Sequence, residues 1–167
     1  RPEGINKSSI EMLKKLKVDG VGMGIEVSSE AFRKNHLNRF PAQDKIIEAF
    51  SLLKDAGIKR TSYNIIGLPN ETEDMIIETI KFNSLLQPDN ITVAFYSPYL
   101  GTNLQEESEK LGDFNNYEYN VDNQLRTVTK SSSIDKNLLN FYKKEFTKLV
   151  RDGLGKLDEL KKLEMKN

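Results

Sequence analysis

The feature that most constrains the fold is an alternation between short apolar runs and segments with helical periodicity. The apolar runs occupy residues 21–27, 59–68 and 90–99. Between them, apolar residues recur at the three- and four-residue spacing of amphipathic helices. Strands that alternate with helices form parallel sheets, because each crossover helix returns the chain to the same end of the sheet. We therefore predict an α/β fold with a parallel sheet whose strands are covered on both faces.

The helices around these strands can be located from their caps and apolar stripes. Asn6 has the character of a helix N-cap, and the stripe that follows it is expected to end at Asp19 and Gly20. The residues of that stripe are Ile10, Leu13 and Leu16. The remaining predicted helices of this region are a short one from Ser28 or Ser29, one after Pro41 that ends at Gly57, one over 72–86 and one over 103–111.

The sequence changes character after residue 111, so we predict a βα region over 1–111 followed by two further segments. Residues 112–133 are polar and lack periodicity, which indicates a long loop or extended strap. Its aromatic residues are expected to pack locally rather than stack on bases, because no Lys or Arg lies among Phe114, Tyr117 and Tyr119. Residues 134–167 are predicted to be a helical tail that breaks at Gly153 and Gly155. Its apolar stripe consists of Leu138, Tyr142, Phe146 and Leu149.

Composition argues against several classes of function. The 25 Lys and Arg balance the 25 Asp and Glu, so no charge excess indicates nucleic-acid or membrane binding. The chain has no cysteine and one histidine, His36. We therefore expect no disulfide and no metal ligand, and we assign His36 no role. No apolar stretch approaches the roughly 20 residues of a membrane helix, and the first residues lack a secretory core, so we predict a cytoplasmic protein.

Two charged residues are candidates for ligand binding, because ligands of parallel α/β sheets bind at the carboxyl ends of the strands. Glu26 ends the first strand. Its carboxylate can accept hydrogen bonds from vicinal hydroxyls such as those of a ribose. It can also be a charge at a helix N-terminus or pair with a nearby arginine. Arg39 lies in a loop and can grip a carboxylate or phosphate with two hydrogen bonds, although a solvated surface arginine is the commoner case. Position alone leaves these alternatives open.

The turn Gly-Leu-Pro-Asn-Glu-Thr separates the second strand from the next helix. Gly67 leaves room for a flat ligand or a neighbouring backbone at the strand end, and Pro69 fixes the turn. Glu71 and Thr72 can satisfy free amides at the helix start, so we predict that Glu71 mainly holds the loop. The loop is then expected to form one wall of a pocket, above Ile65 and Ile66.

Three segments together resemble a known family. They are GIEVSSEAFRKNHLNR (24–39), IIEAFSLLKDAGIKRTSYNIIGLPNETEDMIIETI (46–80) and VAFYSPYLGTNL (93–104). In this order and spacing they resemble the C-terminal half of a radical S-adenosylmethionine (radical SAM) core. The likeness is strongest to the group with a cobalamin-binding domain ahead of that core, and it covers about residues 1 to 111. It implies about three βα units, corresponding to strands 4–6 of an incomplete, TIM-like (β/α)6 barrel.

The resemblance also implies which residues contact S-adenosylmethionine (SAM). Glu26 matches the carboxylate that contacts the SAM ribose, and Arg39 matches an arginine that often faces the methionyl carboxylate. The residues that match the lining or border of the adenine are Ile65, Ile66, Gly67, Tyr96, Ser97 and Pro98. The resemblance implies no catalytic residue within this chain.

The cofactors expected from the resemblance are SAM, a 4Fe–4S cluster and, as a further candidate in the parent protein, cobalamin. Family members hold the cluster through a CxxxCxxC motif after the first strand, and this chain has no cysteine. Because the chain begins with Arg1 and Pro2, we expect a fragment of a longer parent that carries the cluster ligands upstream. We expect the fragment to be inactive by itself. A degenerate relative of the family is the alternative.

Two functions from different classes therefore compete. In the first, the chain supplies SAM contacts to a radical SAM enzyme that reductively cleaves SAM to a 5′-deoxyadenosyl radical and acts on an unidentified substrate. In the second, it is a non-catalytic half-barrel that serves as a binding or assembly module. Its exposed strand edge would pair with the missing N-terminal half of the barrel or with a second copy in a homodimer. No nucleic-acid or membrane partner is indicated.

Overall fold

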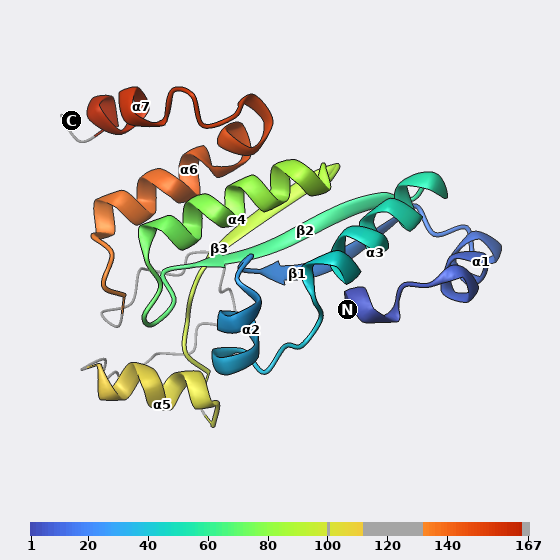
Figure 1. Ribbon diagram of the computed structural model, residues 1–167, viewed down its shortest axis with the longest axis horizontal. Helices are drawn as coiled ribbons and strands as arrows, with labels where there is room; N and C mark the ends of the chain where they lie inside the picture. The colour runs from blue at the N-terminus through green and yellow to red at the C-terminus, as the bar shows by residue number, and fades with distance from the viewer. Residues whose placement is uncertain (100, 112–131, 165–167) are drawn as a thin grey trace. The chain divides into compact units, whose positions relative to one another are not determined.

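The computed structural model describes residues 1–99, 101–111 and 132–164 (Figure 1). Most of the predicted strap, including Phe114, Tyr117 and Tyr119, lies outside the described residues. The described elements are η1 (Pro2–Gly4), α1 (Lys7–Lys15), β1 (Gly20–Glu26), α2 (Glu30–His36), α3 (Gln43–Asp55), β2 (Lys59–Ile66), α4 (Glu73–Leu86), β3 (Asn90–Phe95), α5 (Asn103–Lys110), α6 (Lys136–Asp152) and α7 (Leu157–Glu164).

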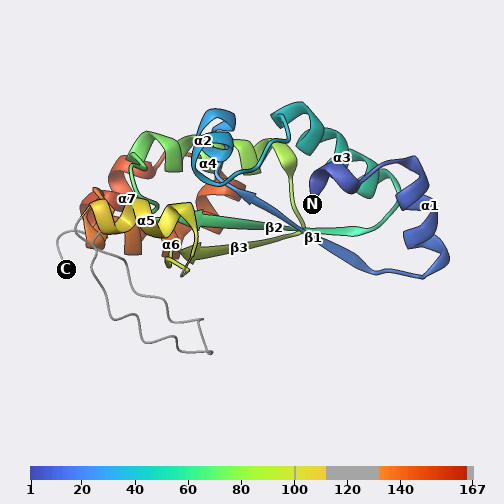
Figure 2. The same ribbon diagram turned by 90° about the horizontal axis from the view of Figure 1, so that it is seen from below.

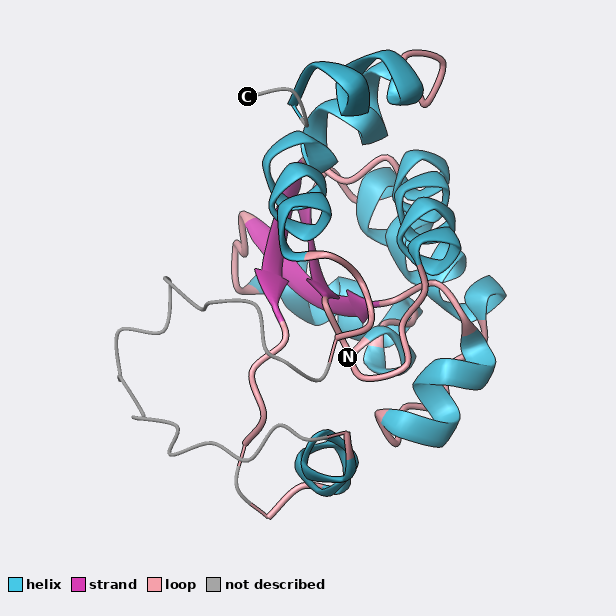
Figure 3. Cartoon of the chain, turned by 90° about the vertical axis from the view of Figure 1, so that its left-hand side faces the viewer, coloured by secondary structure: helices cyan, strands magenta, loops and turns pink. Residues whose placement is uncertain are grey.

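The three strands, drawn in magenta in Figure 3, form one open parallel sheet. Their order in the sheet is β1-β2-β3. β1 pairs with β2 from Gly20 opposite Lys59 to Glu26 opposite Asn64, with an irregularity between Gly24 and Glu26. Strands and helices alternate along the chain, which confirms the predicted α/β class.

The chain divides into two compact units, which are described separately. The first contains residues 1–64 and 78–92, and the second contains residues 65–77 and 93–167 as far as the structure describes them. None of the described helices combines the length and apolar character needed to cross a bilayer.

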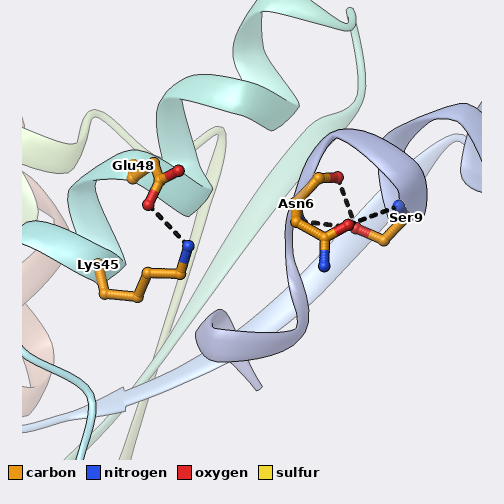
Figure 4. Close-up of polar contacts among 4 residues, drawn as sticks. All are labelled: Asn6, Ser9, Lys45 and Glu48. Carbon is orange, nitrogen blue, oxygen red and sulfur yellow. Dashed lines mark hydrogen bonds and ion pairs between the residues drawn. The ribbon is translucent and has the colours of Figure 1, made fainter.

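In the first unit, α2 and α3 lie on one face of β1 (Figure 2). Helix α1 begins with a capping box: Asn6 Oδ1 accepts the Ser9 N–H at 3.0 Å, and Ser9 Oγ accepts the Asn6 N–H at 2.8 Å (Figure 4). The exposed pair Lys45–Glu48 in the same figure, at 2.7 Å on α3, contributes little to stability. The core of this unit consists of Ile5, Ile10, Met23, Ile25, Ile46, Ala49, Phe50, Leu53, Ile58, Phe82 and Leu86.

The strands are buried on one face rather than on both, which corrects the sequence prediction. On β2, Arg60, Ser62 and Asn64 are buried, while Lys59 and Tyr63 are exposed and Thr61 is half-buried. This alternation is typical of strands with one covered face. Long and polar residues on the buried face therefore need hydrogen-bond partners within the fold.

Several element ends also differ from their predicted positions. Helix α1 ends at Lys15 instead of Asp19–Gly20, because Lys17 adopts a left-handed φ of 53°. Leu16 follows the helix and is 68% exposed, so it does not belong to the apolar stripe. Strand β2 ends at Ile66 because Gly67 has a φ of 79°, and β3 ends at Phe95, four residues before the predicted end.

In the second unit, α6 and α7 pack against each other (Figure 1). The predicted break is confirmed: α6 ends at Asp152, and Gly153 has a φ of 85°. The predicted stripe was wrong at one position, because Leu139 is fully buried whereas Leu138 is only half-buried. The other three stripe residues, Tyr142, Phe146 and Leu149, are buried as predicted.

Candidate functional site

Glu26 and Arg39, both in the first unit, form an ion pair at the carboxyl end of β1. Glu26 Oε1 lies 3.0 Å from Arg39 Nη2. Glu26 is buried and has a left-handed φ of 62°. Burial raises the pKa of Glu26, and the neighbouring Arg39 charge lowers it to a smaller extent. Pairing with an arginine, one of the alternatives for Glu26, is therefore present in the structure.

Gly24 makes room for this ion pair. A Cβ atom at this position would overlap Glu26 Oε1 and lie 3.3 Å from Arg39 Nη1. A similar arrangement occurs two residues earlier, where a Cβ at Gly22 would overlap the ring of Tyr63. The specific neighbours of the β1 glycines were not predicted from the sequence. Their period of two was the available signal, since it places them on one face of the strand.

Arg33 fixes the segment that carries Arg39, and the sequence analysis missed it. Arg33 is 1% exposed. Its guanidinium donates hydrogen bonds to the backbone oxygens of Val27, Ser28 and Pro41. Its own carbonyl accepts the Arg39 N–H at 3.0 Å. Burial lowers the pKa of Arg33. One arginine of the segment is thus structural, while the other reaches Glu26.

A buried polar network links the segment after β1 to β2 and α4 within the first unit. The Ser28 N–H donates to Thr79 Oγ1 at 3.0 Å. Asn83 Nδ2 donates to Asn64 Oδ1 at 2.8 Å and to the carbonyl of Thr79 at 2.9 Å. All four residues are buried. The signal for this network was the asparagine in a strand that was predicted to be covered, because a buried amide requires a hydrogen-bond partner.

Glu71 lies at the centre of the Gly-Leu-Pro-Asn-Glu-Thr turn in the second unit. It is fully buried, and its Oε2 accepts the N–H groups of Gly67 at 2.5 Å and Leu68 at 3.2 Å. Among the described residues, its Oε1 has no hydrogen-bond partner. Burial raises the pKa of Glu71 to about 8, against the opposing effect of the two backbone N–H groups.

The partners of Glu71 correct one detail of the sequence prediction. They lie at the end of β2, not at the start of α4. The start of α4 instead has Thr72 Oγ1, which accepts the Met75 N–H at 3.4 Å. Pro69 is buried within the turn. The carboxylate therefore fastens the turn to the strand that precedes it.

The remaining predicted adenine contacts also lie in the second unit. Ile66 is fully buried and Ile65 is half-buried. The Tyr96 N–H donates to the Ile66 carbonyl at 2.8 Å. The Tyr96 hydroxyl donates to the Leu104 carbonyl and lies 3.0 Å from Ser108 Oγ, so this side chain is bound to α5. After Tyr96, the two remaining predicted contacts are half-buried Ser97 and buried Pro98.

The residues of this chain do not fit a 4Fe–4S cluster. The sequence contains no cysteine to supply thiolate ligands. Within the described ranges, no group of three or more His, Asp or Glu side chains is placed to hold a metal ion.

A cavity of about 560 Å³ lies where α6 meets α7, and none of the predicted site residues lines it. Its lining consists of Lys148, Leu149, Asp152, Gly153, Gly155, Lys156 and Leu160. From the sequence, this junction was predicted only as a helix break.

Comparison with known proteins identifies relatives. Residues 2–82 match the family model of the Radical SAM superfamily. The anaerobic magnesium-protoporphyrin IX monomethyl ester cyclase of Rubrivivax gelatinosus is 29% identical over 120 residues, which are 71% of this chain and 21% of the relative. The solved structure of archaeal Methanocaldococcus infernus Elp3 with an N-terminal deletion (1–46) is 25% identical, with a TM-score of 0.60 over 66% of this chain and 26% of that chain. The chain thus spans about a quarter or less of these proteins.

Proposed function

Because residues 2–82 match the radical SAM superfamily, as the sequence resemblance predicted, we propose that this chain contributes SAM contacts to a radical SAM enzyme. SAM supplies a 5′-deoxyadenosyl radical when it is reductively cleaved in such enzymes. This chain cannot hold the cluster that delivers the electron, since it has no cysteine. We therefore propose that the chain alone is inactive and that the reaction belongs to a longer protein.

The ion pair between Glu26 and Arg39 is the observation that carries this proposal. Their atoms approach to 3.0 Å at the end of a parallel strand, and Gly24 leaves the space they occupy. A guanidinium has five N–H donors. Arg39 can therefore keep its contact with Glu26 and donate further hydrogen bonds to the methionyl carboxylate of SAM. The carboxylate of Glu26 can likewise accept a hydrogen bond from a ribose hydroxyl.

The adenine contacts are proposed for the backbone and apolar groups of the second unit. Gly67 would contribute through its backbone, because Leu139 packs where its side chain would lie, and half-buried Ile65 precedes it on the chain. Tyr96 would contribute through its backbone, because its hydroxyl is bound to α5. Ser97 and Pro98 complete the proposed border of the base.

The proposal specifies no substrate, and it includes a second cofactor only as a candidate. The name of the cyclase refers to magnesium-protoporphyrin IX monomethyl ester, but the alignment covers only 21% of that protein. We therefore take no substrate from it. Cobalamin is a candidate cofactor of the longer protein on the sequence resemblance alone. The proposed partners are the N-terminal half of the barrel and, through the same strand edge, a second copy of this chain.

NMR shift mapping of the 15N-labelled chain tests the proposal. We expect SAM to shift the amide resonances of Glu26, Arg39 and Gly67 with a weak Kd, on the order of 1 mM. Weak binding is expected because the remaining SAM contacts are supplied elsewhere. Glu26→Gln should weaken the response, whereas the exposed control Lys34→Met should not.

Two results would contradict the proposal in different ways. Calorimetric binding about a thousandfold tighter than 1 mM would show that the chain holds a complete SAM site. If none of the three amide resonances shifted at the highest soluble concentration of SAM, the proposed SAM binding would be rejected. A stable dimer in sedimentation would then favour the assembly module.

A further inference from the structure

The C-terminal helices contact the loop formed by residues 67–73, and all these contacts lie within the second unit. At the start of the loop, Leu139 of α6 packs on Gly67, where a Cβ would lie 3.3 Å from Leu139 Cδ1. In its middle, the backbone carbonyl of Glu71 accepts a hydrogen bond of 3.1 Å from Ser133 Oγ. The segment that begins at residue 132 therefore touches both the turn and the end of β2.

At the end of the loop, Glu73 is bound by one side chain from each of the two C-terminal helices. The hydroxyl of Tyr142 on α6 and the ammonium of Lys161 on α7 both donate to Glu73 Oε1. Lys161 Nζ also lies 5.4 Å from the centre of the Tyr142 ring. Hydrogen bonds to a carboxylate are stronger than neutral ones. Glu73 is therefore bound to two different helices through a single oxygen atom.

The charge state of Glu73 agrees with this arrangement. Burial raises the pKa of Glu73, but the hydrogen bonds from Lys161 and Tyr142 outweigh this and leave it below its usual range. Glu73 is thus ionised at neutral pH, as the contact with Lys161 requires. Because Tyr142 is fully buried, its hydroxyl depends on Glu73 for a partner within the fold.

We propose that α6 and α7 position the 67–73 loop, with Tyr142 and Lys161 as the positioning residues that act through Glu73. The turn is closed on itself by Glu71, whose carboxylate binds the N–H groups of Gly67 and Leu68. The helical tail then fixes this closed turn from outside. The consequence for SAM affinity rests on the proposed function, in which Gly67 borders the adenine.

Hydrogen exchange of the 15N-labelled full chain, measured by NMR without SAM, tests the positioning role. Tyr142→Phe and Lys161→Met each remove one donor to Glu73 and keep most of the side chain. We expect the Gly67 and Leu68 amides to exchange about tenfold faster in both variants. The amide of Phe146, in the middle of α6, should keep its protection.

Two further variants separate positioning from general stability. Lys161→Arg retains a donor to Glu73, so its loop amides should be as protected as those of the unsubstituted protein. Lys162→Met changes the exposed neighbouring lysine of α7 and should leave exchange unchanged.

Unchanged exchange at Gly67 and Leu68 in both Tyr142→Phe and Lys161→Met would overturn the proposal. It would equally be overturned if Gly67, Phe146 and the buried Ala49 of the first unit all exchanged faster by the same factor, because the effect would then be global. Since SAM is absent from this measurement, its outcome is independent of the proposed function. Faster loop exchange combined with no SAM-induced shift would support the positioning role and reject SAM binding.

Discussion

Asn83 Nδ2 donates a hydrogen bond of 2.8 Å to Asn64 Oδ1, and both side chains are buried between α4 and β2. A buried amide that loses its partner costs about 1–3 kcal/mol. We predict that Asn64→Ala and Asn83→Ala each lower the free energy of unfolding by about this amount. The double variant should lose about 1 kcal/mol less than the sum, because the second substitution removes an amide that has already lost this partner.

Urea unfolding of the unsubstituted protein, the two single variants and the double variant checks this coupling. Asn137→Ala, which changes an exposed asparagine of α6, should shift the free energy of unfolding by no more than about 0.5 kcal/mol. Strictly additive losses at positions 64 and 83 would show that the two amides do not depend on each other.

Arg39 is predicted to control the ionisation of Glu26. Burial raises the pKa of Glu26 and Arg39 lowers it, so Arg39→Met should raise the pKa further. Carbon-detected NMR titration of the Glu26 carboxyl measures this directly. Lys34→Met, which removes an exposed positive charge from α2, should leave the Glu26 titration in place. A Glu26 pKa that falls or stays the same in Arg39→Met would contradict the ion pair.

Gly24→Ala is predicted to break the same ion pair without removing either charge. The added Cβ would overlap Glu26 Oε1, so the carboxylate must move away from Arg39. Because Oε1 is the far end of a flexible side chain, we expect a small loss of stability, about 1 kcal/mol. The NMR titration should nevertheless show a raised Glu26 pKa. If the pKa matched that of the unsubstituted protein, the space at Gly24 would have no role in the pairing.

The parts of the fold that depend on local chemistry could be predicted from the sequence. Asn6 caps α1 and Ser29 caps α2, because a side-chain oxygen can satisfy the free amides of the next turn wherever the helix packs. Gly57 and Gly153 end helices with a positive φ that costs glycine little. The order of strands and helices could also be predicted, because apolar residues recur with a different period in strands than in helices.

The parts that depend on tertiary contacts could not be predicted. Arg33 and Arg39 belong to one segment and have the same chemistry, yet docking of α2 buries the first and leaves the second to meet Glu26. Leu138 and Leu139 are adjacent residues of the same type, and only the packing of α6 shows that Leu139 is the one that faces the core. Strand β2 ends at Ile66 because the turn requires Gly67 in a left-handed conformation, which an apolar pattern does not reveal.

The stability of the chain is predicted to depend on pH through Glu71. Its pKa is raised by burial to about 8 in the folded state, from 4.5 as the ordinary value. The folded protein therefore holds this proton more tightly than the unfolded chain. The resulting stabilisation is complete below the ordinary pKa and is lost as the pH rises toward the folded pKa. Between these limits the loss is about 1.4 kcal/mol per pH unit.

Glu71→Gln tests this dependence, because the amide oxygen can still accept the Gly67 and Leu68 N–H groups but does not titrate. Urea unfolding at about pH 5.5 and about pH 7.5 should show the unsubstituted protein losing stability relative to Glu71→Gln as the pH rises. Glu73→Gln is the matched control on the same loop. Since hydrogen bonds from Lys161 and Tyr142 overcome burial and lower the pKa of Glu73, that variant should differ from the unsubstituted protein by the same amount at both pH values. If the free energies of unfolding of Glu71→Gln and the unsubstituted protein changed equally with pH, Glu71 would be ionised in the folded state. The effect of its two N–H partners on its pKa would then outweigh that of its burial.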